Sequence, residues 1–399
     1  MFDSTPVYPP DAVFGIAAEY RNDPNPKKIN LTVGMYQDES GKIPVMDSVH
    51  RVELELANAR GSHVYLPIDG MNQYNELIGK LILGDAHSAI TEGRVATAQT
   101  PGGTAALRVA GDLLKRIVDA KTIWISNPSW ANHPQIYNTV GLEVKRYDYL
   151  DQHGTGMDFE AVIKSLSTAA AGDVVLLHTV CHNPTGVDPS PEQWVELLNL
   201  VREKQLVPIF DFAYQGFGEG LNEDAKPIRD FCADGGQALI CNSFSKNFNL
   251  YGERVGGITA VGGSPEAAAA LLSQIKSIIR TNYSNPPTHG AAIVARVLSD
   301  PELRKNWEQE LNAIRNRIGE LRSKFVQALD ARTPGNDFSH INRQRGMFSY
   351  SGISAENVDR LKNEYSIYLL RSGRVNIAGI NEQNLDPLCD AIAAVVGAS

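Results

Sequence analysis

Short apolar runs alternate with helix-length segments between about residues 95 and 262. Each run spans three to five residues and is bounded by polar or turn residues: Thr122–Ile125, Val174–Leu177, Val207–Phe210, Ala238–Ile240 and Gly257–Val261. Such runs are typical of buried strands in a mostly parallel sheet, whose strands are joined by crossover helices. The pattern therefore predicts a large α/β domain.

The pattern changes after residue 300. Between Pro301 and Leu329 the apolar residues recur at the spacing of an amphipathic helix, as Leu303, Trp307, Leu311, Ile314, Ile318, Leu321 and Phe325. Strand-like runs follow at Met347–Tyr350 and Ile367–Leu370, and helices are expected at Ser354–Glu364 and after Asn381.

These two patterns predict two domains. We expect a large domain over residues 45–313 and a smaller α+β domain formed by residues 1–44 together with 314–399. The long helix at about 301–329 is expected to bridge the two domains.

Composition excludes several classes of function. The 37 Lys and Arg against 46 Asp and Glu give a net charge of −9, which repels nucleic acid. The longest apolar run, Ala391–Val396, is shorter than the ~20 residues that cross a bilayer. The N-terminus lacks a basic and apolar leader, so we expect the cytoplasm. The four cysteines lie too far apart for a CxxC pair; we expect reduced, mostly buried thiols and no metal site.

Polar side chains follow the predicted strands where each strand ends. They are Trp130, Asn183, Asp211, Tyr214, Ser243 and Lys246. Because ligands in an open parallel sheet bind beyond the carboxyl ends of the strands, we expect these residues to lie together. Each alone has a structural alternative: Asp211 as a helix N-cap, Trp130 as packing, Asn183 as part of a turn and Lys246 as a solvated side chain. Their joint position favours a site.

A glycine motif points to a phosphate. Thr100–Thr104 contains two glycines and opens a helix expected at Ala105–Ile117, where backbone N–H groups and the helix dipole attract an anion. A tight turn is the alternative for this motif. Ser243 and Arg254 are candidates to complete the cradle. With neither GxGxxG nor GxxxxGK[ST] present, a compact monophosphate cofactor is favoured over NAD or ATP.

Five segments carry a resemblance to a known family. They are Cys181–Gly186, Asp211–Phe217, Ser243–Gly256, Asn282–Pro287 and Ser372–Asn376. Together they resemble the class I pyridoxal-phosphate aminotransferases of fold type I, in the branch that acts on aspartate and aromatic amino acids. The resemblance covers essentially the whole chain and implies a large domain with a seven-stranded-type sheet and a smaller α+β domain.

The resemblance implies roles around pyridoxal 5′-phosphate. Lys246 would hold the cofactor covalently and move a proton, Asp211 would face the pyridine nitrogen, and Trp130 would stack on the ring. Tyr214 and Asn183 would bind the ring oxygen. The phosphate would be held by Gly103, Thr104, Ser243 and Arg254, with Tyr65 from the partner subunit, and His133 and His178 would support Asp211 from behind.

It also implies how substrate is bound. Arg374 would clamp the α-carboxylate, and Arg280 would reach the distal carboxylate across a homodimer interface. Trp130, Asn183 and Gly34 would contact the substrate, Gly34 from a strand that closes over it. The chain departs from the family pattern at Phe14, which is bulkier than the expected lid residue, and at Thr32, which replaces a small residue.

The implied activity is ping-pong transamination. The amino group of aspartate, glutamate or an aromatic amino acid would pass to a 2-oxo acid such as 2-oxoglutarate. One alternative is β- or γ-elimination or replacement with the same cofactor. A nicotinamide-dependent oxidoreductase is disfavoured by the missing GxGxxG, and a catalytically silent binding protein is disfavoured by the presence of Lys246 and Asp211.

Overall fold

A seven-stranded sheet forms the centre of the computed structural model, which describes residues 2–7, 12–59, 61–233 and 235–397. Its strands, in the order β2-β8-β7-β6-β5-β3-β4, are β2 (Val95–Thr100), β8 (Gly256–Val261), β7 (Ala238–Ser243), β6 (Val207–Phe212), β5 (Val174–His178), β3 (Thr122–Asn127) and β4 (Glu143–Asp148). Only β8 runs antiparallel to its two neighbours among these strands. The predicted mostly parallel α/β sheet is confirmed.

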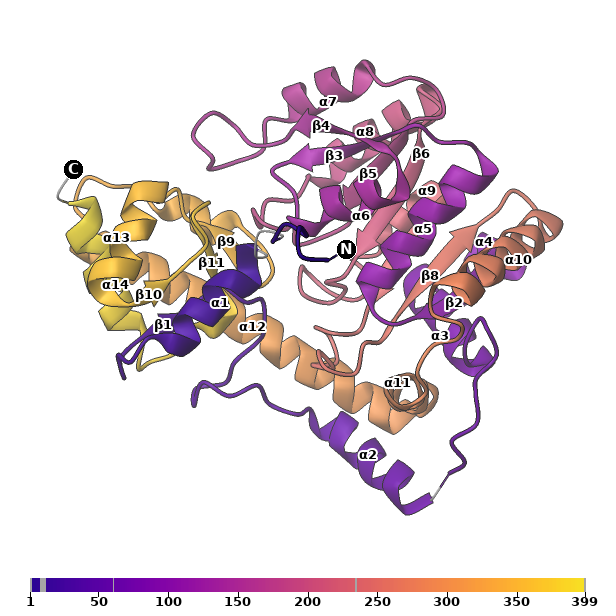
Figure 1. The fold of residues 1–399 in the computed structure, drawn as a ribbon, viewed down its shortest axis with the longest axis horizontal. Coiled ribbons are helices and arrows are strands. Elements are labelled where there is room, and N and C mark those ends of the chain that lie inside the picture. Colours follow the sequence, from indigo (N-terminus) through magenta and orange to yellow (C-terminus); the bar gives the residue numbers. More distant parts are fainter. Residues whose placement is uncertain (1, 8–11, 60, 234, 398–399) are drawn as a thin grey trace.

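Helices cover both faces of this sheet (Figure 1). The helices of the first three hundred residues, whether or not they cover the sheet, are α1 (Ala12–Asn22), α2 (Asp47–Ala59), α3 (Asn72–Leu83), α4 (Ser88–Thr91), α5 (Gly103–Ile117), α6 (Asn132–Val140), α7 (Phe159–Ser167), α8 (Pro191–Glu203), α9 (Lys226–Ala233), α10 (Pro265–Asn282) and α11 (His289–Ser299). The remaining elements are α12 (Pro301–Arg332), η1 (Ser339–Arg343), β9 (Phe348–Tyr350), α13 (Ala355–Tyr365), β10 (Ile367–Tyr368), β11 (Arg374–Asn376), η2 (Ile377–Gly379) and α14 (Leu385–Val396).

Side chains of one strand alternate between two hydrophobic cores. In β5, Val174 and Leu176 pack in the core shared with α5, α6 and α10, whereas Val175 and Leu177 pack in the core shared with α3, α7, α8, α9 and α11. This follows from the two-residue period of a strand, since successive side chains point to opposite faces. Both faces are apolar, which explains the continuous apolar runs in the sequence.

The sequence pattern does not predict two of the seven strands of this sheet, β2 and β4. β4 lies at the sheet edge and buries only Tyr147 among its six residues, so its sequence reads as polar. β2 consists mainly of small and polar residues. Edge position and cross-strand pairing, rather than apolar content, place these segments in the sheet.

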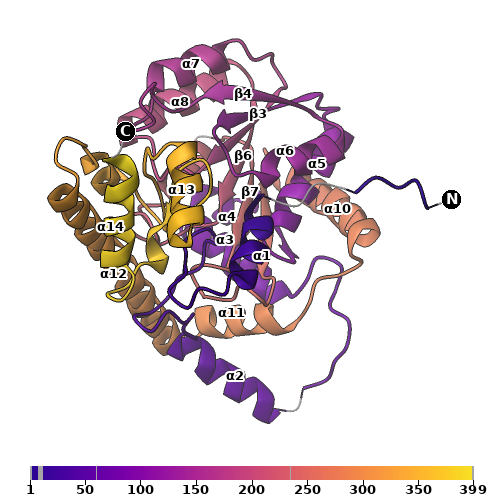
Figure 2. The same cartoon turned by 60° about the vertical axis from the view of Figure 1, so that its left-hand side comes forward.

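The long helix after residue 300 is confirmed as α12. All seven apolar positions that predict it are buried. The Asp300 side chain caps its N-terminus by accepting hydrogen bonds from the backbone N–H groups of Glu302 and Leu303, and Pro301 occupies the first turn. α12 packs against α2 and α11 at one end and against α14 at the other (Figures 1 and 2).

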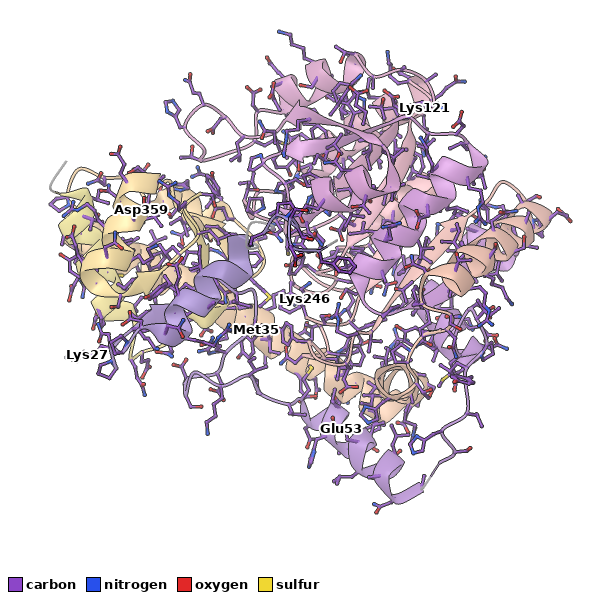
Figure 3. All side chains as sticks on the ribbon, viewed as in Figure 1. Lys27, Met35, Glu53, Lys121, Lys246 and Asp359 are labelled. Carbon is purple, nitrogen blue, oxygen red and sulfur yellow. The ribbon has the colours of Figure 1, made fainter. Side chains whose placement is uncertain are left out.

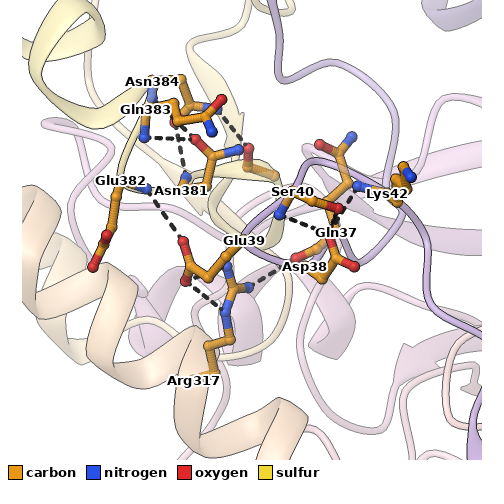
Figure 4. Close-up of polar contacts among 11 residues, drawn as sticks. Gln37, Asp38, Glu39, Ser40, Lys42, Arg317, Asn381, Glu382, Gln383 and Asn384 are labelled. Atoms are coloured by element: carbon orange, nitrogen blue, oxygen red, sulfur yellow. Dashed lines mark hydrogen bonds and ion pairs between the residues drawn. The ribbon is translucent and has the colours of Figure 1, made fainter.

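The N-terminal segment joins the C-terminal elements. β1 (Ile29–Asn30) pairs in parallel with β10, and β9 pairs antiparallel with β11. Figure 4 shows Arg317 of α12 donating to a Glu39 carboxylate oxygen at 2.8 Å and to the Gln37 carbonyl at 2.8 Å. The second Glu39 oxygen accepts from the Glu382 backbone N–H. The predicted strands and helices of the tail are confirmed, while the exact domain boundaries stay a prediction. No helix in the described ranges is long and apolar enough to cross a membrane.

Candidate active site

The carboxyl ends of the parallel strands bring the predicted polar residues together. In the sheet register, Asp211 of β6 lies opposite His178 of β5 and Cys241 of β7. Lys246 follows three residues after the end of β7, and Figure 3 labels it near the centre of the molecule, between the sheet and the C-terminal elements. Asp211 lies within β6, so the N-cap alternative for this residue is wrong.

A chain of hydrogen bonds supports Asp211 from behind. His133 Nε2 lies 3.1 Å from Asp211 Oδ2, and a carboxylate only accepts, so His133 donates. Ser129 Oγ lies 2.9 Å from His133 Nδ1 and 3.1 Å from His178 Nε2, and His178 Nδ1 accepts from the Asn183 backbone N–H at 3.5 Å. His133 thus connects Asp211 to Ser129, and Ser129 connects His133 to His178.

The chain of hydrogen bonds sets the charge of these groups. Burial raises the pKa of the Asp211 carboxyl, but the hydrogen bond from His133, together with the electrostatic effects of His133, His178 and Lys246, outweighs burial, so the pKa lies below its usual value. Burial lowers the pKa of His178 to about 3. The site therefore holds a largely buried carboxylate at neutral pH, with the neutral imidazole of His178 three hydrogen bonds behind it.

Lys246 carries an amine that is easily deprotonated. Burial lowers its pKa from 10.5 to about 8, with Asp211 opposing the shift and Arg254 adding to it. Its Nζ lies 5.0 Å from the ring centroid of Tyr214. Burial also raises the pKa of the Tyr214 phenol, so the phenol keeps its proton. A buried amine of this kind is suited to attack an aldehyde and to exchange protons near neutral pH.

An anion cradle lies at the N-terminus of α5. Gly102 has a φ of +82°, and a Cβ there would lie 2.4 Å from Arg254 Nη2. A Cβ on Gly103 would lie 3.3 Å from Ser243 Cβ. Arg254 donates to Ser245 Oγ at 3.2 Å and to the Tyr251 carbonyl at 3.1 Å. Glycines thus let a guanidinium and a hydroxyl approach a helix N-terminus, the arrangement that binds phosphate groups.

Arg374 is a buried cation without an acidic partner among the described residues. Its Nη1 donates to Asn183 Oδ1 at 3.0 Å, its Nη2 donates to the Thr32 carbonyl, and its Nε has no hydrogen-bond partner. The side chain is 4% exposed, and burial lowers its pKa to about 10. Since an unpaired buried charge is costly, this guanidinium is prepared for an anionic ligand.

Comparison with known proteins identifies the family. The model of the family "Aminotransferase class I and II" matches residues 26–392. The chain is 48% identical over 396 residues to the aspartate aminotransferase of Escherichia coli K12, and 42% identical over 397 residues to the aromatic-amino-acid aminotransferase of that organism. Each match covers 99% of this chain and 100% of the relative. The chain belongs to the class I and II aminotransferases.

A solved structure agrees with this assignment. The aromatic-amino-acid aminotransferase from Burkholderia pseudomallei, covalently bound to pyridoxal phosphate, superposes on this aminotransferase with a TM-score of 0.96. The two chains are 45% identical, and the match covers 99% of each. The fold type predicted from the motifs is therefore confirmed.

Two predicted site residues lie apart from the others within this aminotransferase chain. Tyr65 is 93% exposed in the segment between α2 and α3, and Arg280 is exposed near the end of α10, where it donates to Ser284 Oγ. Asn285 Nδ2 donates to the Leu66 carbonyl at 3.2 Å, so the two segments lie on the same surface. Thr104, in the first turn of α5, also has an exposed side chain.

The position of Gly34 corrects one prediction. The strand β1 ends at Asn30, and Gly34 lies in the irregular segment that follows, not in a strand. The strands β1 and β10 pair over only two residues. Beyond them, the Thr32 carbonyl accepts a hydrogen bond from Arg374, and Gly34 lies against the ring of Phe348. The side chain of Phe14 lies outside the described residues.

Some contacts in the aminotransferase site involve residues that the sequence did not single out. Asp188 accepts hydrogen bonds from the backbone N–H groups of Cys181 and His182, both at 2.8 Å, and so fixes the loop that carries Asn183. Ser245 contacts Arg254. Trp130, which is partly buried, packs edge-on against His133 at 5.1 Å. Ser245 could have been identified from the sequence because it lies directly before Lys246. Nothing in the sequence marks Asp188.

Proposed function

We propose that this aminotransferase uses pyridoxal 5′-phosphate to move the amino group of an amino acid to a 2-oxo acid in a ping-pong cycle. One observation carries the proposal: a buried amine and a buried unpaired guanidinium are joined by a continuous series of contacts. The Lys246 amine lies 5.0 Å from the Tyr214 ring, Tyr214 lies 6.4 Å from Phe348, and Phe348 lies 3.9 Å from Arg374.

The residues present fit this cofactor at three points. The Lys246 amine suits its aldehyde, the α5 N-terminus with Arg254 and Ser243 suits its phosphate, and the Asp211 carboxylate suits a protonated ring nitrogen. Gly103 and Thr104 offer backbone N–H groups at the same helix end. When bound, pyridoxal phosphate withdraws electrons from the amino acid and makes its Cα proton acidic.

We propose a separate role for each side chain around the cofactor. We assign to Lys246 the covalent attachment of the cofactor and the transfer of a proton at the substrate Cα, because its pKa of about 8 lets the amine lose and regain a proton near neutral pH. Asp211, backed by His133 and His178, would keep the ring nitrogen protonated. Trp130 would cover one face of the ring, and Tyr214 and Asn183 would donate to its oxygen.

Arg374 would bind the α-carboxylate of substrate, since its guanidinium is buried, contacts the Phe348 ring next to Tyr214, and keeps an Nε without a hydrogen-bond partner. We propose aspartate, glutamate and aromatic amino acids as donors, as the names of the relatives suggest. A distal carboxylate needs a second cation. Arg280 is the candidate, acting with Tyr65 across the interface of a homodimer, because both residues are exposed on one surface of this chain.

The organisation of the protein enters the same proposal. We propose the cytoplasm as its compartment, supported by four described cysteines that are buried and unpaired. We also propose that the domains divide near residues 45 and 313. The pairing of β1 with β10 and the contacts of α12 with both α2 and α14 support this division.

The test begins with the absorption spectrum of the purified protein. A yellow protein that borohydride bleaches, with the label on Lys246, is expected, and Lys246→Ala should lose both the label and turnover. A panel of amino donors with 2-oxoglutarate, with identification of the products, then separates transamination from elimination. Absence of a cofactor spectrum, or release of ammonia with no new amino acid, contradicts the proposal.

A further inference from the structure

We propose that Phe348 is a positioning residue, whose ring holds the Arg374 guanidinium in the orientation that receives the substrate carboxylate. This inference rests on the proposed function, in which Arg374 binds the α-carboxylate. It adds a residue that contacts the guanidinium on its face, where a carboxylate cannot bind with two hydrogen bonds.

The ring and the guanidinium are in direct contact. Arg374 Cζ lies 3.9 Å from the ring centroid of Phe348, and each residue is 4% exposed. At this distance a guanidinium is attracted to the face of an aromatic ring, more strongly when both are removed from water. The N–H groups of a planar guanidinium lie in its own plane, which is the plane of two-point carboxylate binding, so a ring against its face holds that plane without occupying the donors.

The sheet register places the two residues together. In the antiparallel pair of β9 and β11, Arg374 lies opposite Tyr350 and Asn376 lies opposite Phe348. Phe348 and Arg374 are therefore diagonal neighbours on one face of the pair, within reach of aromatic and long side chains. The backbone thus fixes the contact and does not leave it to flexible side chains.

Gly34 holds the ring from another side. A Cβ at Gly34 would lie 2.2 Å from Phe348 Cζ, and all three of the nearest atoms belong to this ring. Only glycine leaves the ring in its place. The same segment supplies the Thr32 carbonyl that accepts from Arg374 Nη2. Phe348 therefore lies between the segment of residues 32–34 and the guanidinium, and contacts both.

The guanidinium has donors left for a ligand. Of its N–H groups, one on Nη1 and one on Nη2 bond to Asn183 and Thr32, and Nε has no partner. Removing the ring would let the side chain rotate about its remaining contacts. Since the α-carboxylate is common to all donors, we expect Phe348 to act on every substrate equally and not on the choice between them.

The experiment compares Phe348→Leu with Phe217→Leu in the enzyme loaded with its cofactor. Phe217 is a matched control because its buried ring lies 6.3 Å from Tyr214, much as Phe348 lies 6.4 Å from it, and no described contact joins Phe217 to Arg374. We measure KM and kcat for aspartate and phenylalanine, and the inhibition constant of 3-phenylpropionate, whose single carboxylate needs only one cation.

Phe348→Leu should raise both KM values and the inhibition constant by about tenfold, with kcat within about threefold, because binding common to ground state and transition state is lost. Phe217→Leu should change these values less than threefold. Equal effects of the two variants on KM and on the inhibition constant would overturn the proposal. A wild-type enzyme without transaminase activity would instead overturn the proposed function.

A double variant keeps the test independent of folding losses in Phe348→Leu. Gly34→Ala alone should raise the inhibition constant, because the new methyl group displaces the ring. In Gly34→Ala with Phe348→Leu the methyl group has no ring to displace, so adding Gly34→Ala should then change the constant less than twofold. Additive effects, with melting temperatures that show all variants folded, would show that Gly34 and Phe348 act separately and would contradict the proposal.

Discussion

At the scale of single residues, burial controls the chemistry of Lys246. A lysine with a pKa of about 8 has roughly a tenth of its amine deprotonated at pH 7, whereas an ordinary lysine has far less than a hundredth. Asp211 limits the shift by stabilising the ammonium form, and Arg254 promotes it. The charges of Asp211 and Arg254 therefore act in opposite directions on the pKa of the Lys246 amine. Arg254 also belongs to the anion cradle at the N-terminus of α5.

This pKa has a consequence for stability. The folded chain without cofactor binds the Lys246 proton less tightly than the unfolded chain, so between about pH 8 and pH 10.5 the unfolded chain holds more protons and stability rises with pH. We expect the melting temperature of the cofactor-free protein to rise relative to Lys246→Met across this interval, and the difference to be constant below pH 7. A difference that does not change with pH would show that burial does not lower this pKa.

Asp211 provides a second prediction at this scale. Asp211→Asn keeps the size of the side chain and an oxygen that accepts from His133, but removes the negative charge. We expect kcat to fall by about 10²–10³-fold, typical of losing a preorganised electrostatic group, with the cofactor still bound. Single-turnover rates measure the loss, and melting curves check the fold. Full activity in this variant would remove Asp211 from the mechanism.

At the scale of elements, the turn into α5 requires glycine at position 102 for two reasons. Gly102 has a φ of +82°, which side chains disfavour, and its missing Cβ leaves space for Arg254. The backbone at Gly256 passes equally close, since a Cβ there would lie 2.7 Å from the carbonyl carbon of Gly102. The strand β8 and the helix α5 therefore meet at the cradle with no room for side chains.

Gly102→Ala should lower the affinity for pyridoxal phosphate, and the loss should exceed the one expected from its effect on the melting temperature alone. Gly141→Ala is the control, because Gly141 also has a positive φ of +86° but nothing lies within 4 Å of its Cβ position. Both variants carry backbone strain, of order 1 kcal/mol, and only the first displaces Arg254. Equilibrium dialysis of pyridoxal phosphate against both variants, alongside melting curves, distinguishes them. Equal affinities would show that Gly102 serves the turn alone.

At the scale of the whole molecule, the homodimer that we propose would complete the site. Tyr65 and Arg280 are exposed, whereas Lys246 and Asp211 are partly buried and Arg374 is buried. In a two-fold dimer both sites are equivalent and each takes residues from both chains. The exposed apolar residues Val45, Leu54 and Val64, which lie in and around α2 near Tyr65 in the sequence, suit such an interface.

Mixing two inactive parents tests this arrangement. A hybrid of Lys246→Ala with Arg280→Ala chains would contain one site free of both changes and one site with both. We expect aspartate activity to reappear after subunit exchange, and Arg280→Ala alone to weaken aspartate use by about 2–5 kcal/mol while phenylalanine stays within about tenfold. Hybrids without activity, or equal loss of both substrates in Arg280→Ala, would place Arg280 outside the site.

The amino-acid sequence is enough to predict most of the sheet strands, the long helix and the polar groups proposed for the chemistry. Strands that are buried on both faces are largely apolar, so their apolar runs predict β3, β5, β6, β7 and β8. The helical spacing of apolar residues predicts α12 in the same way. Because parallel strands end at one edge, the order of Asn183, Asp211 and Lys246 along the chain already predicted that they meet. Local motifs alone identified the glycines at α5.

The contacts that orient these groups depend on the folded chain and cannot be predicted from the sequence pattern. Phe348 and Asp188 have no local signal, because Phe348 acts through its contact with Arg374 in another strand and Asp188 acts through the folded loop at Cys181. Ser245 is marked only by its position beside Lys246, and its contact with Arg254 appears only in the folded chain. The strand expected at Gly34 gave way to an irregular segment that contacts Phe348. The edge strand β4 was missed because pairing with β3 compensates for its polar sequence. Periodicity reports the burial of each face, whereas orientation depends on neighbours that only the folded chain brings together.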